Sequence, residues 1–197
     1  MPELYATDFS LGATIGFLYY FSVGLFLRFG MPGASRATHH LGMAFLYAGG
    51  LAFAYIPSAL IYEPWSSVHR YMTIPMAMLQ FTHLSQFFFY FPTPMAPGLA
   101  RVVLYIKYSV TILVTGAFFL STQDGQYFYH FAGHYWDFDA DIFSRNIGLL
   151  LLFLTVLVLI TGLAQGIRSK SQRWVTIGMA FIMFFITFAA GLPNTLR

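Results

Sequence analysis

The chain has 197 residues, of which 58% are hydrophobic, 20% aromatic and only 9% charged. Because a soluble domain usually carries about 25% charged residues, this composition excludes a water-facing globular protein and indicates an integral membrane protein. The absence of cysteine excludes disulfides and thiolate-ligated metals, and the residues behind the net charge of +3 form no basic run that would bind nucleic acid.

Six apolar segments are each long enough for a helix that crosses the roughly 30 Å hydrocarbon core of a membrane, which takes about 20 residues. These predicted spans, in chain order, are Phe9–Leu27, Leu41–Tyr62, Tyr71–Phe91, Val102–Ser121, Asn146–Ile167 and Trp174–Leu192. The breaks between them are short except for residues 122–145, and no internal repeat is present. The sequence therefore predicts one all-α integral membrane domain over residues 1–197, a polytopic transmembrane helical bundle.

Lys and Arg residues gather at one side of this predicted bundle. Seven of the ten lie in or beside the loops that follow the first, third and fifth spans: Arg28, Arg36, Arg101, Lys107, Arg168, Lys170 and Arg173. All seven Asp and Glu residues fall at the other side. The positive-inside rule then places the basic loops in the cytoplasm and both termini outside. We therefore predict a multi-pass protein of the cytoplasmic (inner) membrane, surrounded by membrane lipids.

Ionisable residues also flank the second predicted span. His39 and His40 begin the second helix beside Arg36 and are expected to lie among the lipid headgroups on the cytoplasmic side. Beyond its other end, Arg70 is expected to pair with Glu63 or with an acid of the 122–145 stretch. Such an exposed pair contributes little energy, but it fixes how two loops meet.

A semi-polar stripe runs along the third predicted span, within the segment "QFTHLSQFFFYF". Gln80, His83 and Gln86 are three residues apart and share one helix face, which Tyr90 continues. Polar groups at this depth face the bundle interior, where they bond neighbouring helices or contact a ligand, and both interpretations stay open for His83. A haem is disfavoured because no other predicted span has a histidine in its interior.

The fourth predicted span contains one lysine. Lys107 lies about 9 Å into this span, and Thr111 and Thr115 continue its face. Antiparallel packing of the third and fourth spans predicts that Lys107 and His83 lie at similar depth. The lysine either extends toward the membrane surface or is held against a polar pocket.

The polar and aromatic stretch between the fourth and fifth spans contains "QYFYHFAGHYWDFDADIFSR". His130 and His134 are four residues apart, a spacing that puts both imidazoles on one helical face, and three acids follow: Asp137, Asp139 and Asp141. The segment is interpreted either as interfacial, with aromatic rings in the membrane and acids in water, or as a cap that faces a ligand or metal. No known metal-binding motif is present, so no bound metal and no other cofactor is expected.

Catalysis has little support, because no acid lies within a span and no nucleophile motif is present; whether the chain belongs to an enzyme stays open. The segments "SSVHRYMTIP…THLSQFFFYFP", with the aromatic-rich outer loop, resemble the N-terminal multi-span sensor regions, of the seven-span type, of bacterial receptor adenylate/guanylate cyclases and histidine kinases. The resemblance implies a sensor that receives an outside or in-membrane signal, such as a small hydrophobic ligand. It also implies a relay to a cytoplasmic output domain, often in a homodimer.

Two features bear on this expectation. The segment "AAGLPNTLR" is typical of a chain about to turn back into the membrane, and whether the reading frame continues past Arg197 into a seventh span and an output domain stays open. The alternative is a small integral subunit of a larger respiratory or photosynthetic complex, in which phenylalanine-rich faces pack against other membrane subunits.

Overall fold

A computed structural model of the protein describes residues 6–122, 125–131, 134–139 and 141–195. Six α-helices account for most of the chain: α1 (Asp8–Leu25), α2 (Arg36–Leu60), α3 (His69–Tyr90), α4 (Pro97–Ser121), α5 (Asp141–Arg168) and α6 (Arg173–Thr195). A π-helical turn, η1 (Phe26–Gly30), extends α1, and a 3₁₀ turn, η2 (Pro64–Ser66), precedes α3. Between α4 and α5, strands β1 (Gln126–His130) and β2 (Tyr135–Asp139) form an antiparallel hairpin. Each predicted span is thus a helix, and the mostly helical fold is confirmed.

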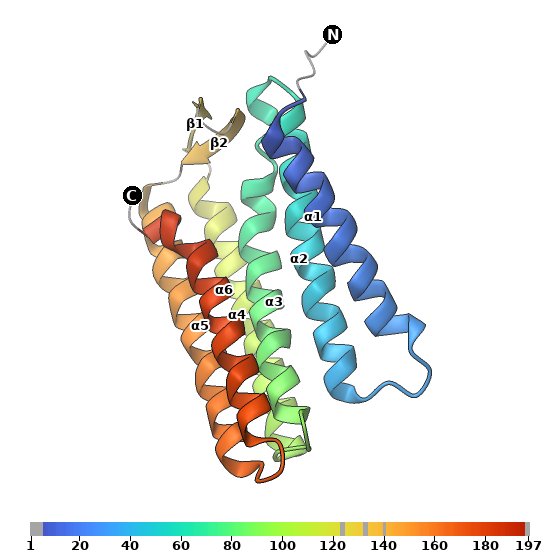
Figure 1. The fold of residues 1–197 in the computed structure, drawn as a ribbon. Coiled ribbons are helices and arrows are strands. Elements are labelled where there is room, and N and C mark those ends of the chain that lie inside the picture. The colour runs from blue at the N-terminus through green and yellow to red at the C-terminus, as the bar shows by residue number, and fades with distance from the viewer. Residues whose placement is uncertain (1–5, 123–124, 132–133, 140, 196–197) are drawn as a thin grey trace.

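The helices run side by side, and α3 lies inside the bundle (Figure 1). It packs against α2, α4 and α5, whereas α1 packs against α2 and α6 against α5. The loops α1–α2, α3–α4 and α5–α6 lie together at one end, called here the arginine end (residues 26–40, 91–101 and 165–173). The hairpin and the α2–α3 connection lie at the other, the hairpin end (residues 61–69, 126–130 and 135–139), where α1 begins and α6 ends.

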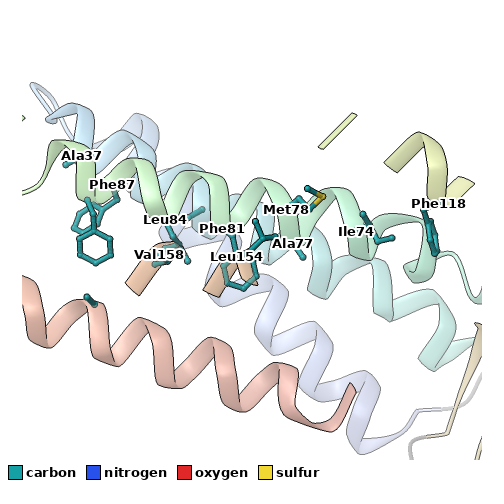
Figure 2. Close-up of a cluster of buried hydrophobic side chains, with 13 residues drawn as sticks. Ala37, Ile74, Ala77, Met78, Phe81, Leu84, Phe87, Phe118, Leu154 and Val158 are labelled. Carbon is teal, nitrogen blue, oxygen red and sulfur yellow. The ribbon is translucent and has the colours of Figure 1, made fainter. Parts of the chain in front are cut away.

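The middle of α3 is buried on every side. All nine residues from 81 to 89 are buried, including four phenylalanines that meet the neighbouring helices. Phe81 and Leu84 project toward Leu154 and Val158 of α5 (Figure 2). This full enclosure allows α3 to carry polar residues, because its neighbours shield them from the surroundings of the bundle.

Small residues bring α5 and α6 close to α3. An added Cβ at Gly162 would lie 2.5 Å from the Cβ of Ala180 and 3.3 Å from the ring of Phe88. Ala180 and Phe88 are both fully buried. A larger side chain at Gly162 would therefore push α6 away from α5.

Four helices are long and apolar enough to cross a membrane, counting only the described residues: Asp8–Gly30, Arg36–Leu60, Pro97–Ser121 and Gly148–Arg168. The described apolar part of α6, Arg173–Phe185, is shorter. Large apolar side chains cover the outer surfaces of α1 and α4, for example Leu11, Ile112 and Leu120, which are 60%, 72% and 76% exposed. Such a surface suits lipid rather than water.

Candidate functional site

Two imidazoles and a phenol meet where α2, α3 and α4 come together near the arginine end. The Nδ1 atoms of His40 and His83 are 2.9 Å apart, and the Tyr108 hydroxyl lies 2.9 Å from His83 Nε2. His83 is 3% exposed, so both of its ring nitrogens are bonded inside the bundle. We call His40, His83 and Tyr108 the histidine cluster.

Aromatic rings hold the two imidazoles in place. Tyr90 stacks on His40 with ring centroids 5.4 Å apart and an interplanar angle of 11°. Tyr47 stacks on His83 at 5.5 Å and 24°. The guanidinium of Arg36 lies 5.8 Å from the Tyr90 ring, within the range of a cation–π contact. The stacked tyrosine rings therefore restrain the orientations in which the two imidazoles contact each other.

The start of α2 places His40 in this cluster. The Ser35 side chain accepts a hydrogen bond from the Thr38 amide, so the helix begins at Arg36, five residues before the predicted span. His40 consequently lies one turn inside the helix. The premise that no second histidine faces His83 is wrong, and His40 contacts a side chain of α3 inside the bundle. The Ser35 cap was the sequence signal for this extra turn.

Beyond the protons of two neutral imidazoles, the histidine cluster accepts one additional proton only. Each Nδ1 atom either donates or accepts, and two N–H groups cannot face each other at 2.9 Å. With both rings neutral, one Nδ1–H donates to the other Nδ1 and the chain of bonds continues to the Tyr108 hydroxyl. The direct N···N contact also leaves no space for a metal ion between these two nitrogens, since each metal–nitrogen bond alone takes about 2.0–2.1 Å.

Further polar contacts attach α4 to α3. Lys107 donates from Nζ to the Ser85 hydroxyl, which in turn donates to the Thr82 carbonyl over 2.8 Å. Gln86 donates to the Ala100 carbonyl, also over 2.8 Å. These bonds place Lys107 against a polar partner at the depth of His83, as antiparallel packing predicts.

The remaining candidates of the third-span stripe differ in their surroundings. Gln86 is fully buried, and its Oε1 atom has no hydrogen-bond partner among the described residues. Gln80 is half-buried, and no hydrogen bond from its side chain to a described residue is found.

Gln165 on α5, which the sequence analysis does not predict as a site residue, is 1% exposed and donates to the Thr93 carbonyl of the α3–α4 loop. An isolated glutamine in an apolar run was the only signal for it.

At the hairpin end, a buried carboxylate ties β2 to the first turn of α3. Arg70 contacts Asp137 twice, with Nε 2.6 Å from Oδ1 and Nη2 donating to Oδ2 over 3.0 Å. His69 Nε2 lies 3.2 Å from Oδ1, and His130 Nε2 lies 3.3 Å from Oδ2. The Asp137 side chain is only 7% exposed. We call these four residues the Asp137 latch.

The latch corrects one expectation and confirms another. Arg70 does pair with an acid of the 122–145 stretch, as predicted. The pair is not a weak surface contact, however, because a buried carboxylate that loses its cation is strongly destabilising. The paired oxygens and the planar guanidinium also fix the angle at which the hairpin meets α3.

His69 is the most enclosed member of the latch. Its side chain is 1% exposed and stacks on Tyr55 with ring centroids 4.3 Å apart. His69 precedes the predicted third span, and burial lowers its pKa, although the hydrogen bond with Asp137 partly opposes this effect. A neutral His69 that donates its Nε2–H to Asp137 fits these surroundings. Its Nδ1 atom has no hydrogen-bond partner among the described residues.

The expectation that His130 and His134 share a helical face is wrong. His130 ends β1, whereas His134 is an exposed turn residue with a left-handed backbone, φ 52°. Aromatic residues, which are enriched in strands, make up most of "QYFYH" and "YWDFD", and this composition favours paired strands over a helix. The backbone of Asp139 pairs with Gln126, but its side chain lies outside the described residues.

The described side chains of the hairpin end form no recognisable metal centre. Within the described part of the chain, no group of three His, Asp or Glu side chains is arranged to hold a metal ion. Arg70 occupies both oxygens of Asp137, which would otherwise be the natural ligand between the two imidazoles. The arrangement is therefore an ionic contact between a loop and a helix.

Comparison of the chain with protein-family models, curated proteins and solved structures found no match.

Proposed function

We propose that this chain is an integral membrane sensor domain in which α3 relays a signal from the hairpin end to the arginine end. One observation carries the proposal: a single helix holds the Asp137 latch in its first turn and the histidine cluster further along. His69 and His83 are 14 residues apart, which is about 21 Å along a helix axis. A change in how the hairpin meets α3 would thus move the partners of His83 directly.

The α3–α4 interface suits such a relay. Among the described residues of α4, only Ala100, Thr111 and Phe118 are buried, so little apolar packing locks this helix. Besides the buried Phe118 and the stacking of Phe119 on Tyr71, polar contacts to Ser85, Gln86 and His83 hold it. Hydrogen bonds exchange partners more readily than a packed core rearranges, so α4 has a route to a second position.

The membrane arrangement follows from charge and enclosure. We place all six helices across the cytoplasmic membrane, with α3 shielded by its neighbours and the arginine end in the cytoplasm. The hairpin and both termini then lie outside. The output would pass to a cytoplasmic domain or to a partner, a second copy of this chain included.

A distance measurement tests the relay. Spin labels at Phe29→Cys and Tyr105→Cys, 70% and 63% exposed in the native chain, would span the bundle from η1 to α4. Asp137→Asn should shift the distance distribution between them, whereas Glu63→Gln, at the same end but outside the latch, should not. If the hairpin of Asp137→Asn has become mobile and the distance distribution between the two labels is unchanged, the relay is refuted.

A second candidate function is that of a small subunit in a larger membrane complex. It is favoured by the sparse burial of α1 and α4, whose most apolar windows are each 11% buried among the described residues. Such faces would pack against other subunits. Purification from its native membrane in mild detergent decides between the two: constant copurifying proteins support the subunit, and their absence supports the sensor.

A further inference from the structure

A groove opens at the hairpin end between α1, α2 and β2. Its volume is about 490 Å³, within the range of roughly 300–1,000 Å³ that small-molecule sites occupy. Small residues of α1 and α2 and aromatic rings form its lining: Asp8, Phe9, Gly12, Ala13, Ala52, Tyr55 and Tyr135. At Gly12 an added Cβ would meet nothing within 4 Å, so the floor of the groove is open there.

Three rings from three elements form the aromatic wall. Phe9 stacks on Tyr135 at 4.9 Å and meets Tyr55 edge to face at 5.8 Å. Tyr55 and Tyr135 also meet edge to face, at 6.4 Å and 84°. Tyr55 is backed by His69, whose ring stacks on it at 4.3 Å. Tyr55 thus stands at right angles to the stacked pair of Phe9 and Tyr135, which fixes the three rings, and aromatic faces attract organic cations.

One acid lines the groove. Asp8 is exposed in the first turn of α1, and no hydrogen bond or ion pair joins its side chain to any described residue. No Lys, Arg or His is among the described lining residues. A cation would therefore find both a carboxylate and aromatic faces, whereas a phosphate beside it would find no positive partner.

We propose that this groove binds an organic ammonium ion, an alkylammonium group on an apolar body. The ammonium contacts Asp8 and the aromatic wall, and the apolar body lies along Gly12, Ala13 and Ala52. A phospholipid headgroup carries a phosphate, and the described lining residues offer no cation to pair with it. The site is therefore assigned to a free ammonium compound rather than to a phospholipid headgroup. This binding site is inferred without use of the relay through α3, although His69 of the latch backs Tyr55 of the aromatic wall.

Calorimetric titration of the purified chain in a non-ionic detergent tests the proposal. The probe is phenethylammonium, and the matched uncharged compound is 2-phenylethanol. We expect saturable one-to-one binding of the cation, and binding of the alcohol that is weaker by about tenfold or more. Asp8→Asn should weaken binding of the cation by a similar factor. Gly12→Phe, which fills the open floor of the groove, should abolish binding.

Two control variants match these changes. Glu63→Gln removes another acid of the hairpin end, and Gly178→Phe fills an equally open glycine on α6; both should bind the probe as the native chain does. Equal affinity of the native chain and Asp8→Asn, equal affinity for cation and alcohol, or no saturable binding would overturn the proposal. Displacement of the probe by phosphatidylethanolamine in mixed micelles would overturn the assignment to a free ion.

Discussion

His83 joins three helices because its two ring nitrogens bond different neighbours. Nδ1 lies 2.9 Å from Nδ1 of His40 on α2, and Nε2 lies 2.9 Å from the Tyr108 hydroxyl on α4. One imidazole thus couples the positions of α2 and α4 through α3, and the pair of histidines accepts a single additional proton.

Replacing His83 by leucine should leave the protein folded but less stable. His40 and Tyr108 each lose a buried partner, so we expect the free energy of unfolding to fall by about 1–3 kcal/mol. A double-mutant cycle with His40→Leu isolates their contact, for which bonds between membrane helices suggest about 0.6–1.7 kcal/mol. Strictly additive effects, measured by reversible unfolding in detergent, would show that the two rings do not interact.

Breaking the Asp137 latch should have a larger effect than changing a nearby exposed acid. Arg70→Gln leaves the buried carboxylate without its cation, and such a loss costs about 3–5 kcal/mol. Glu63→Gln is the control, because Glu63 lies at the same end outside the latch. Thermal unfolding of both variants is the measurement. Equal stabilities would mean that the latch contributes nothing.

Gln86 and Gln80 provide a matched pair on one helix. Gln86→Leu removes the hydrogen bond that its side chain donates to the Ala100 carbonyl of α4, and we expect a loss of about 1 kcal/mol. Gln80→Leu removes no hydrogen bond to a described residue and should cost little. If Gln80→Leu destabilises the protein as much as Gln86→Leu, the bond to Ala100 is not what makes Gln86 important.

The absence of cysteine makes the membrane orientation simple to test. A cysteine at Tyr127, 47% exposed in β1, should react with an impermeant reagent added outside intact cells. A cysteine at Lys170, in the α5–α6 loop, should react only after the membrane is permeabilised. The reverse pattern would place the hairpin in the cytoplasm and overturn the assignment of the arginine end to that side.

The sequence predicted the helices well because apolar length alone specifies them. Every predicted span lies within or largely overlaps a helix, from α1 to α6. The polar positions of α3 followed from the same principle. Gln86 and His83 needed partners in an apolar run, and the structure supplies them from α4 and α2.

The sequence did not predict which partners these would be. The contact of His40 with His83 joins residues 43 positions apart and depends on one extra helical turn set by Ser35. The sequence does not predict the hairpin, because the four-residue spacing of His130 and His134 also fits a helix. The high content of aromatic residues beside them is the better guide to strands.

Nitrogen resonances of the His40 and His83 rings test the relay through α3 most directly. In the native chain these signals report the bonded pair near the arginine end. We predict that Asp137→Asn, made in the latch whose His69 lies about 21 Å from His83 along α3, will shift both signals, while Glu63→Gln leaves them in place. Unchanged signals in Asp137→Asn, with the hairpin resonances themselves displaced, would contradict the account.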